Sequence, residues 1–235
     1  SLTKHIDETM ALVVEKLLHP AFDKADFERV KNNAIQQEIN SRKNAGYLAS
    51  TAYKQLLQGD NIASMPSGGN QATLEKLSLE DITSFYKTYV NPKNSQLITV
   101  SNLDQKSIEK SISVLKVWQG EGPSLALDFP EPDTKKGVIY LVHKDNSAQS
   151  AIRIGKRALK RDITGEFYRT GLMNFPLGGS FNSRINLNLR EDKGYTYGAR
   201  SYFSGDKHSG YFTATAEVRA DATDKSIVEF VKEIE

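Results

Sequence analysis

Cysteine does not occur among the 235 residues. Its absence excludes disulfides, thiolate metal ligands and cysteine nucleophiles. Histidine is scarce, and no two histidines stand with a glutamate at the spacing that a helical metal site uses. We therefore expect that this chain alone holds no metal cofactor. The histidines are His5, His19, His143 and His208.

An excess of one charge and long apolar runs are also lacking. The 31 basic and 29 acidic residues leave a net charge of +2, which is too small to attract nucleic acid through a global field. The densest basic cluster, at residues 156–161, has no interleaved aromatic residues, so we interpret it as solvated surface. No apolar run approaches the roughly 20 residues of a membrane span. We expect neither nucleic acid as a partner nor a membrane span.

Apolar residues recur at helical spacing through most of the first half of the chain. Ser78, with Asp81 three residues later, resembles a capping box that opens one of these helices. The expected elements are helices over about 6–18, 27–39, 48–57, 79–89 and 105–115 and a strand over 96–101.

Residues 119–136 differ from their surroundings, because glycine and proline punctuate a stretch without helical period. This pattern predicts a linker. Beyond it we expect strands over 138–142 and 150–154 that pair with each other, a helix over 167–173, a helix through 185–189 capped by Ser180, strands over 195–203 and 211–218, and a helix from Thr223.

This order predicts an α+β fold with two related lobes, each a mixed or antiparallel sheet flanked by helices. Residues 1–118 would be the later section of one lobe, and 137–235 the earlier section of the next, joined by the linker over 119–136. Both lobes are expected to be incomplete, because the chain has no Met start and its last helix lacks a C-cap signal. A doubly wound parallel sheet is disfavoured, since the strands occur in adjacent pairs.

The most informative segment is residues 189–198, Leu-Arg-Glu-Asp-Lys-Gly-Tyr-Thr-Tyr-Gly. It ends an amphipathic helix, turns at a glycine and enters an aromatic strand, which places Arg190 and Tyr197 on either side of one turn. Together with residues 177–185, Leu-Gly-Gly-Ser-Phe-Asn-Ser-Arg-Ile, it resembles the insulinase-like, pitrilysin-type zinc peptidases, including their mitochondrial-processing and respiratory-core relatives. Their pattern is small-Ser-Arg-Leu-x-x-x-Leu-Arg-x-x-x-Gly-x-x-Tyr.

The resemblance implies that the Tyr197 hydroxyl donates to a scissile carbonyl as it becomes an oxyanion, and that Arg190 holds the loop or the substrate backbone. It also implies substrate-binding roles for Ser183, Arg184 and Gly198. From spacing alone the alternative stays open that Arg190 is a cation at a helix end and Tyr197 an ordinary strand aromatic.

The chain departs from this family in one respect that matters for chemistry. The catalytic lobe of the family carries H-x-x-E-H, which binds zinc and supplies the general base, and this sequence contains no such motif. The resemblance makes Glu38 a candidate for the third metal ligand of the family, but an isolated glutamate on a charged helix is typical of a solvated face. We therefore favour the non-catalytic half, with zinc in the full-length protein or in a partner half.

Two functions remain as hypotheses. In the first, the chain is part of a zinc metalloendopeptidase that hydrolyses peptides, supplies chamber wall and substrate contacts, and is inactive alone. Its partners would be the catalytic half of the same protein, or a partner subunit, and a peptide substrate. In the second, it is a catalytically silent structural or assembly subunit. A periplasmic or secreted location is expected from bacterial relatives and from the absence of cysteine.

Overall fold

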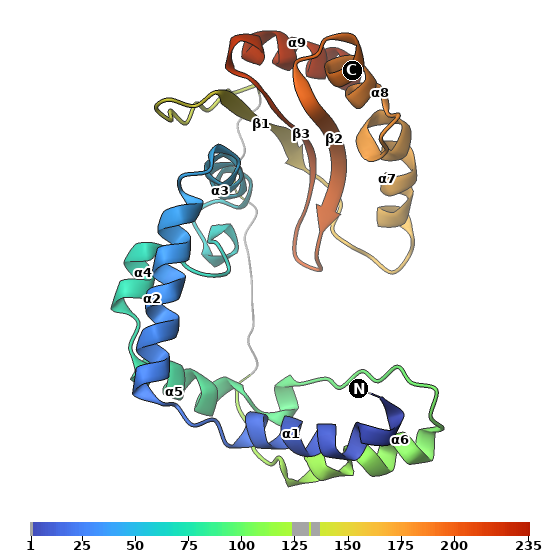
Figure 1. Ribbon diagram of the computed structural model, residues 1–235. Coiled ribbons are helices and arrows are strands. Elements are labelled where there is room, and N and C mark those ends of the chain that lie inside the picture. Colours follow the sequence, from blue (N-terminus) through green and yellow to red (C-terminus); the bar gives the residue numbers. More distant parts are fainter. Residues whose placement is uncertain (1, 124–131, 133–136) are drawn as a thin grey trace. The chain divides into compact units, whose positions relative to one another are not determined.

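The computed structural model describes residues 2–123, 132 and 137–235, so most of the predicted linker over 119–136 lies outside the described residues. The chain forms two compact units. One comprises residues 1–35 and 72–127, and the other comprises residues 36–71 and 128–235. Figure 1 labels the elements of both units.

The first unit is helical, as the apolar spacing predicted. Tyr86 donates a hydrogen bond from its hydroxyl to the carbonyl oxygen of Leu17 at 2.5 Å, and its ring meets Phe22 edge-on at 5.3 Å. The capping box is confirmed, since Ser78 and Asp81 bond each other's backbone N–H groups. The helices are α1 (Ile6–Leu18), the first part of α2 (Lys24–Ser41), α4 (Gln71–Lys76), α5 (Leu79–Tyr89) and α6 (Gln105–Ile112).

Two predicted strands, over 96–101 and 138–142, are wrong. Both segments are irregular and exposed in the structure: the exposed fraction is 95% for Val100 and 91% for Leu141. An extended segment becomes a strand only when its backbone pairs with a neighbour. The part of the chain that the structure describes provides no pairing strand for either segment.

The second unit contains an antiparallel sheet of three strands in the order β1-β3-β2. The strands are β1 (Gln149–Arg157), β2 (Thr196–Gly205) and β3 (Gly210–Arg219). The predicted hairpin of the last two strands is confirmed. The predicted strand over 150–154 is also present, but its partner is β3, with Ile152 opposite Ala216.

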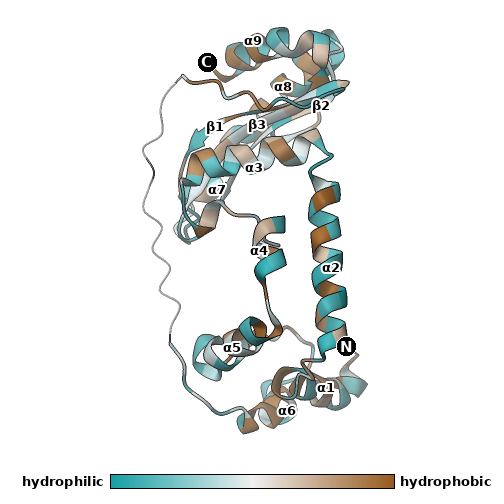
Figure 2. Cartoon of the chain, turned by 90° about the vertical axis from the view of Figure 1, so that its left-hand side faces the viewer, coloured by the Kyte–Doolittle hydropathy of each residue, from teal (hydrophilic) through white to brown (hydrophobic). Residues whose placement is uncertain are grey.

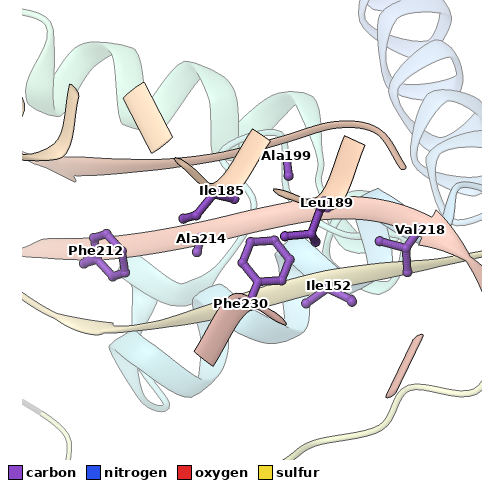
Figure 3. Packing of buried hydrophobic residues seen from close by; sticks show 9 residues of the cluster. Ile152, Ile185, Leu189, Ala199, Phe212, Ala214, Val218 and Phe230 are labelled. Atoms are coloured by element: carbon purple, nitrogen blue, oxygen red, sulfur yellow. The ribbon is translucent and has the colours of Figure 1, made fainter. Parts of the chain in front are cut away.

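Helices cover both faces of this sheet (Figure 2). The apolar face lies under α7 (Glu166–Asn174), α8 (Arg184–Asn186) and α9 (Thr223–Ile234), where Phe230 of α9 is fully buried (Figure 3). The buried core consists of Ile152, Ile185, Leu189, Ala199, Phe212, Ala214, Ala216, Val218 and Phe230.

The opposite face of the sheet is polar and carries α3 (Ala45–Gln58). Tyr53 of α3 donates its hydroxyl proton to the carbonyl oxygen of Phe212 at 2.9 Å, and Arg157 of β1 donates to the carbonyl oxygen of Leu57 at 3.0 Å. These bonds join residues 159 and 100 positions apart in the sequence, so α3 belongs to the unit of the sheet. The division of the whole protein into lobes at 1–118 and 137–235 stays a prediction.

Candidate functional site

Tyr197 lies in an irregularity of β2. Thr196 pairs with Val218 and Ala199 pairs with Ala216, so two residues of β2 stand opposite a single residue of β3. Such a β-bulge bends the strand and re-aims the side chain of an extra residue. The exposed fraction of Tyr197 is 88%, which leaves its ring at the surface although neighbouring Ala199 is in the core.

Arg190 lies in a π-helical turn, η6 (Leu187–Asp192), that continues α8. Its guanidinium carbon is 4.5 Å from the ring centroid of Phe181 and 5.1 Å from that of Tyr197. Its Nε also lies 3.2 Å from a carboxylate oxygen of Glu191. We call Phe181, Arg190 and Tyr197 the aromatic–arginine stack. Each cation–π contact at an exposed site contributes about 0.5–1 kcal/mol.

Asn186 connects the two backbone segments that carry the aromatic rings. Its side-chain nitrogen donates to the carbonyl oxygen of Phe181 at 2.7 Å, and its side-chain oxygen accepts from the backbone N–H of Ala199 at 2.9 Å. The residue is buried, with an exposed fraction of 4%. It lies one turn before Arg190, so a single amide links the turn, the helix and the bulged strand.

The structure thus brings together Arg190 and Tyr197, with Gly198 beside Tyr197 in the bulge. The other two predicted substrate residues point elsewhere. Ser183 is fully buried and its hydroxyl has no hydrogen-bond partner among the described residues, while Arg184 donates to Glu233 of α9 at 2.9 Å. The substrate roles of all five residues stay predictions.

The predicted cap of this helix is wrong, because α8 begins after Ser183 instead of Ser180. The carbonyl oxygen of Ser180 accepts from the N–H of Ser183, and this turn separates the preceding π-helical segment η5 (Phe175–Gly179) from α8. The turn also places Phe181 at the surface. Sequence reasoning missed Phe181 and Asn186 as members of the site, although an apolar residue in a glycine- and serine-rich turn was an available signal.

Glu38 is buried, with an exposed fraction of 7%, so its interpretation as a solvated residue is wrong. Its carboxylate accepts hydrogen bonds from the hydroxyl of Tyr47 and, at 2.7 Å, from Nε of Arg42. The bond from Tyr47, with a smaller contribution from Arg42, lowers the pKa of Glu38, and the same carboxylate raises the pKa of Tyr47. Both carboxylate oxygens therefore have partners within the protein.

Two further features concern ligands and membranes. Among the residues with described positions, no three His, Asp or Glu side chains form a group that could hold a metal ion. No described helix is both long and apolar enough to cross a membrane.

Comparison with known proteins identifies a family whose matched range contains Arg190 and Tyr197. The family description "Peptidase M16 inactive domain" matches residues 76–235. The chain belongs to this family. The resemblance to the non-catalytic half of insulinase-like peptidases is thereby confirmed, as is the α+β fold with an antiparallel sheet flanked by helices.

Individual relatives are similar over nearly the whole chain. "Uncharacterized zinc protease YmxG" of Bacillus subtilis is 24% identical over 90% of this chain and 51% of its own length. "Non-peptidase homolog YmxG" of Helicobacter pylori is 24% identical over 98% of this chain and 55% of its own length. The crystal structure of a peptidase M16 inactive domain from Pseudomonas fluorescens superposes with a TM-score of 0.87 at 23% identity, covering 100% of this chain and 56% of that one. The chain thus spans about half the length of the relatives it matches.

Proposed function

We propose that this chain is the non-catalytic part of an insulinase-like zinc metalloendopeptidase. It forms part of the wall of a peptide-binding chamber and contributes contacts to the substrate and the transition state. Zinc and its ligands come from the rest of the full-length protein or from a partner half. The observation that carries this proposal is the aromatic–arginine stack. In it, Tyr197 lies at the surface, on the bulge of β2, and its ring contacts Arg190.

The chemistry of the stack suits the stabilisation of a developing negative charge. A tyrosine hydroxyl on a rigid strand can donate a hydrogen bond to a carbonyl oxygen as that oxygen becomes an oxyanion. Arg190 packs against the ring of Tyr197 and restricts its position, while its charge favours electron-rich oxygen atoms nearby. Neither residue can activate water, so the chain needs a catalytic half to hydrolyse a peptide.

A second candidate is a catalytically silent structural or assembly subunit. One observation favours it: the Helicobacter pylori relative is named a non-peptidase homolog. In that case the exposed stack would contact a partner protein instead of a substrate. A periplasmic or secreted location fits both candidates. It is proposed because the resemblance is to bacterial proteins and because the chain contains no cysteine.

The experiment that tests the proposal compares Tyr197→Phe with Tyr195→Phe in the zinc-loaded assembly that contains both this chain and the catalytic half. Loss of one oxyanion donor typically lowers kcat on the order of 100- to 1000-fold, and the ring that packs on Arg190 remains. We expect this loss for Tyr197→Phe, with KM little changed. Tyr195→Phe removes the same atom two residues earlier and should leave kcat near the wild-type value.

Hydrolysis of a quenched fluorescent peptide measures both constants. Equal and small effects of the two substitutions would overturn the role of Tyr197. Absence of hydrolysis by the zinc-loaded wild-type assembly would favour the silent subunit.

A further inference from the structure

Phe181 is an exposed aromatic residue that the predicted substrate pair leaves out. The exposed fraction of Phe181 is 63%. The guanidinium carbon of Arg190 lies 4.5 Å from the ring centroid of Phe181 and 5.1 Å from that of Tyr197, so Phe181 is the nearer of the two rings. A phenylalanine at the surface gives up most of the free energy that its burial would contribute. Its contact with Arg190 therefore holds an apolar surface beside the predicted catalytic tyrosine.

Asn186 determines where this apolar surface stands. The carbonyl of Phe181 and the N–H of Ala199 belong to different segments, and the same side-chain amide bonds both, at 2.7 Å and 2.9 Å. Ala199 is the first residue that pairs regularly with β3 after the bulge that carries Tyr197. Because Asn186 is buried, loss of its amide would leave both backbone groups without these partners in the interior.

We propose that Phe181 is a further substrate-binding residue and that Asn186 is the positioning residue that holds Phe181 and Tyr197 on Arg190. This inference rests on the proposed function and names the part of the substrate that the site reads. The charge of Arg190 is partly balanced by Glu191, so the surface of the stack is two aromatic rings with hydrogen-bond donors between them. Such a surface fits an extended peptide whose backbone carbonyl faces the donors and whose apolar side chain packs on Phe181.

The positioning role is measured without any substrate. A guanidinium stacked on aromatic rings has its Nε–H proton shifted upfield by the ring currents, and the signal of Arg190 is assigned by its loss in Arg190→Lys. In the full-length protein with 15N-labelled arginine, we expect Asn186→Ala to move this proton toward the position of free arginine. Asn188→Ala is the matched control, because Asn188 follows two residues later and bonds Glu229 and Glu233 instead.

A conservative variant separates the two bonds of Asn186. Asn186→Asp keeps an acceptor for the N–H of Ala199 but loses the donor to the carbonyl of Phe181. We expect a partial shift of the Arg190 proton, as in Phe181→Leu, because only the ring of Phe181 moves away. An Arg190 signal that stays at its wild-type position in Asn186→Ala and in Asn186→Asp would overturn the positioning role.

The binding role is measured by fluorescence anisotropy with two fluorescein-labelled decapeptides that differ only in a central Leu or Ala. We expect Phe181→Ala to weaken binding of the Leu peptide about tenfold and of the Ala peptide by less than about threefold. Equal losses for both peptides would overturn the contact between Phe181 and an apolar side chain. Failure of the wild-type protein to bind either peptide would overturn the proposed function together with this contact, and the positioning role is decided by the arginine signal alone.

Discussion

Phe230 is part of the core that underlies the helical segment with Arg190. Its truncation tests how much this core stabilises the unit that contains the sheet. Its ring, on α9, is fully buried against the sheet and against the helical segment that carries Arg190 (Figure 3). Replacing phenylalanine with alanine would remove most of the ring from a core that also contains Ile185 and Leu189. We predict that Phe230→Ala lowers the free energy of unfolding substantially.

The magnitude follows from the area that the ring buries. Truncation to alanine removes on the order of 150 Å² of buried apolar surface from the core. At about 25 cal/mol per Å², this corresponds to a loss of roughly 4 kcal/mol in the free energy of unfolding. Measured losses for buried Phe→Ala substitutions span about 3–5 kcal/mol because the surrounding residues relax to different extents. A loss of this size is a large fraction of the stability of an ordinary domain.

Urea denaturation followed by far-ultraviolet circular dichroism measures the loss. Val228→Ala is the matched control, because Val228 is on the same helix and its exposed fraction is 53%. The control should change the free energy of unfolding by no more than about 0.5 kcal/mol. If Phe230→Ala costs less than about 1 kcal/mol, or no more than the control, the packing of α9 on this sheet is not the core that we describe.

Four further predictions concern pH, caps and metal. Burial raises the pKa of Tyr53 from 10.0 to about 12, so the folded protein should lose stability as the pH rises between these two values. Over the same pH range, the urea midpoint of Tyr53→Phe should fall less than that of the wild type. The hydrogen bond from Tyr47 lowers the pKa of Glu38 below 4.5, so ionised Glu38 stabilises the folded protein above that pH and this contribution is lost on acidification. A Glu38→Gln variant whose urea midpoints fell as steeply as those of the wild type below about pH 4.5 would contradict this. Ser78→Ala removes the capping box of α5 and should cost about 1 kcal/mol in thermal unfolding, with Ser84→Ala, in the middle of the same helix, costing less. The chain alone should bind no zinc at micromolar concentration by calorimetry, and stoichiometric binding would show that it holds a metal site after all.

Interactions between residues close in sequence were predicted well. The capping box at Ser78 and the apolar stripes of the helices involve residues three or four apart, so their pattern is visible in the sequence itself. The hairpin of β2 and β3 is likewise local, with its turn marked by Gly205 and Gly210. The pair of Arg190 and Tyr197 was found for the same reason, because both lie within one helix–turn–strand segment.

Interactions between distant segments were not predicted. The segments over 96–101 and 138–142 have the composition of strands, but a strand also needs a neighbour, and residue types alone do not say where that neighbour is. Glu38 is a shorter-range case: its partner Tyr47 lies nine residues later on the next helix, α3, which is beyond the spacing of three or four residues that a helical pattern reveals.

The sequence by itself determined most of the helices, though not α4, together with the hairpin, the family and the position of Arg190 and Tyr197 around one turn. Only the tertiary structure decided that β1 pairs with β3, that α3 packs on the polar face of the sheet, and that Asn186 bonds both Phe181 and Ala199. The physical reason is the range of the interactions. Helical periodicity and caps repeat over a few residues, whereas sheet register and buried polar bonds depend on which distant backbone groups the fold leaves without other partners.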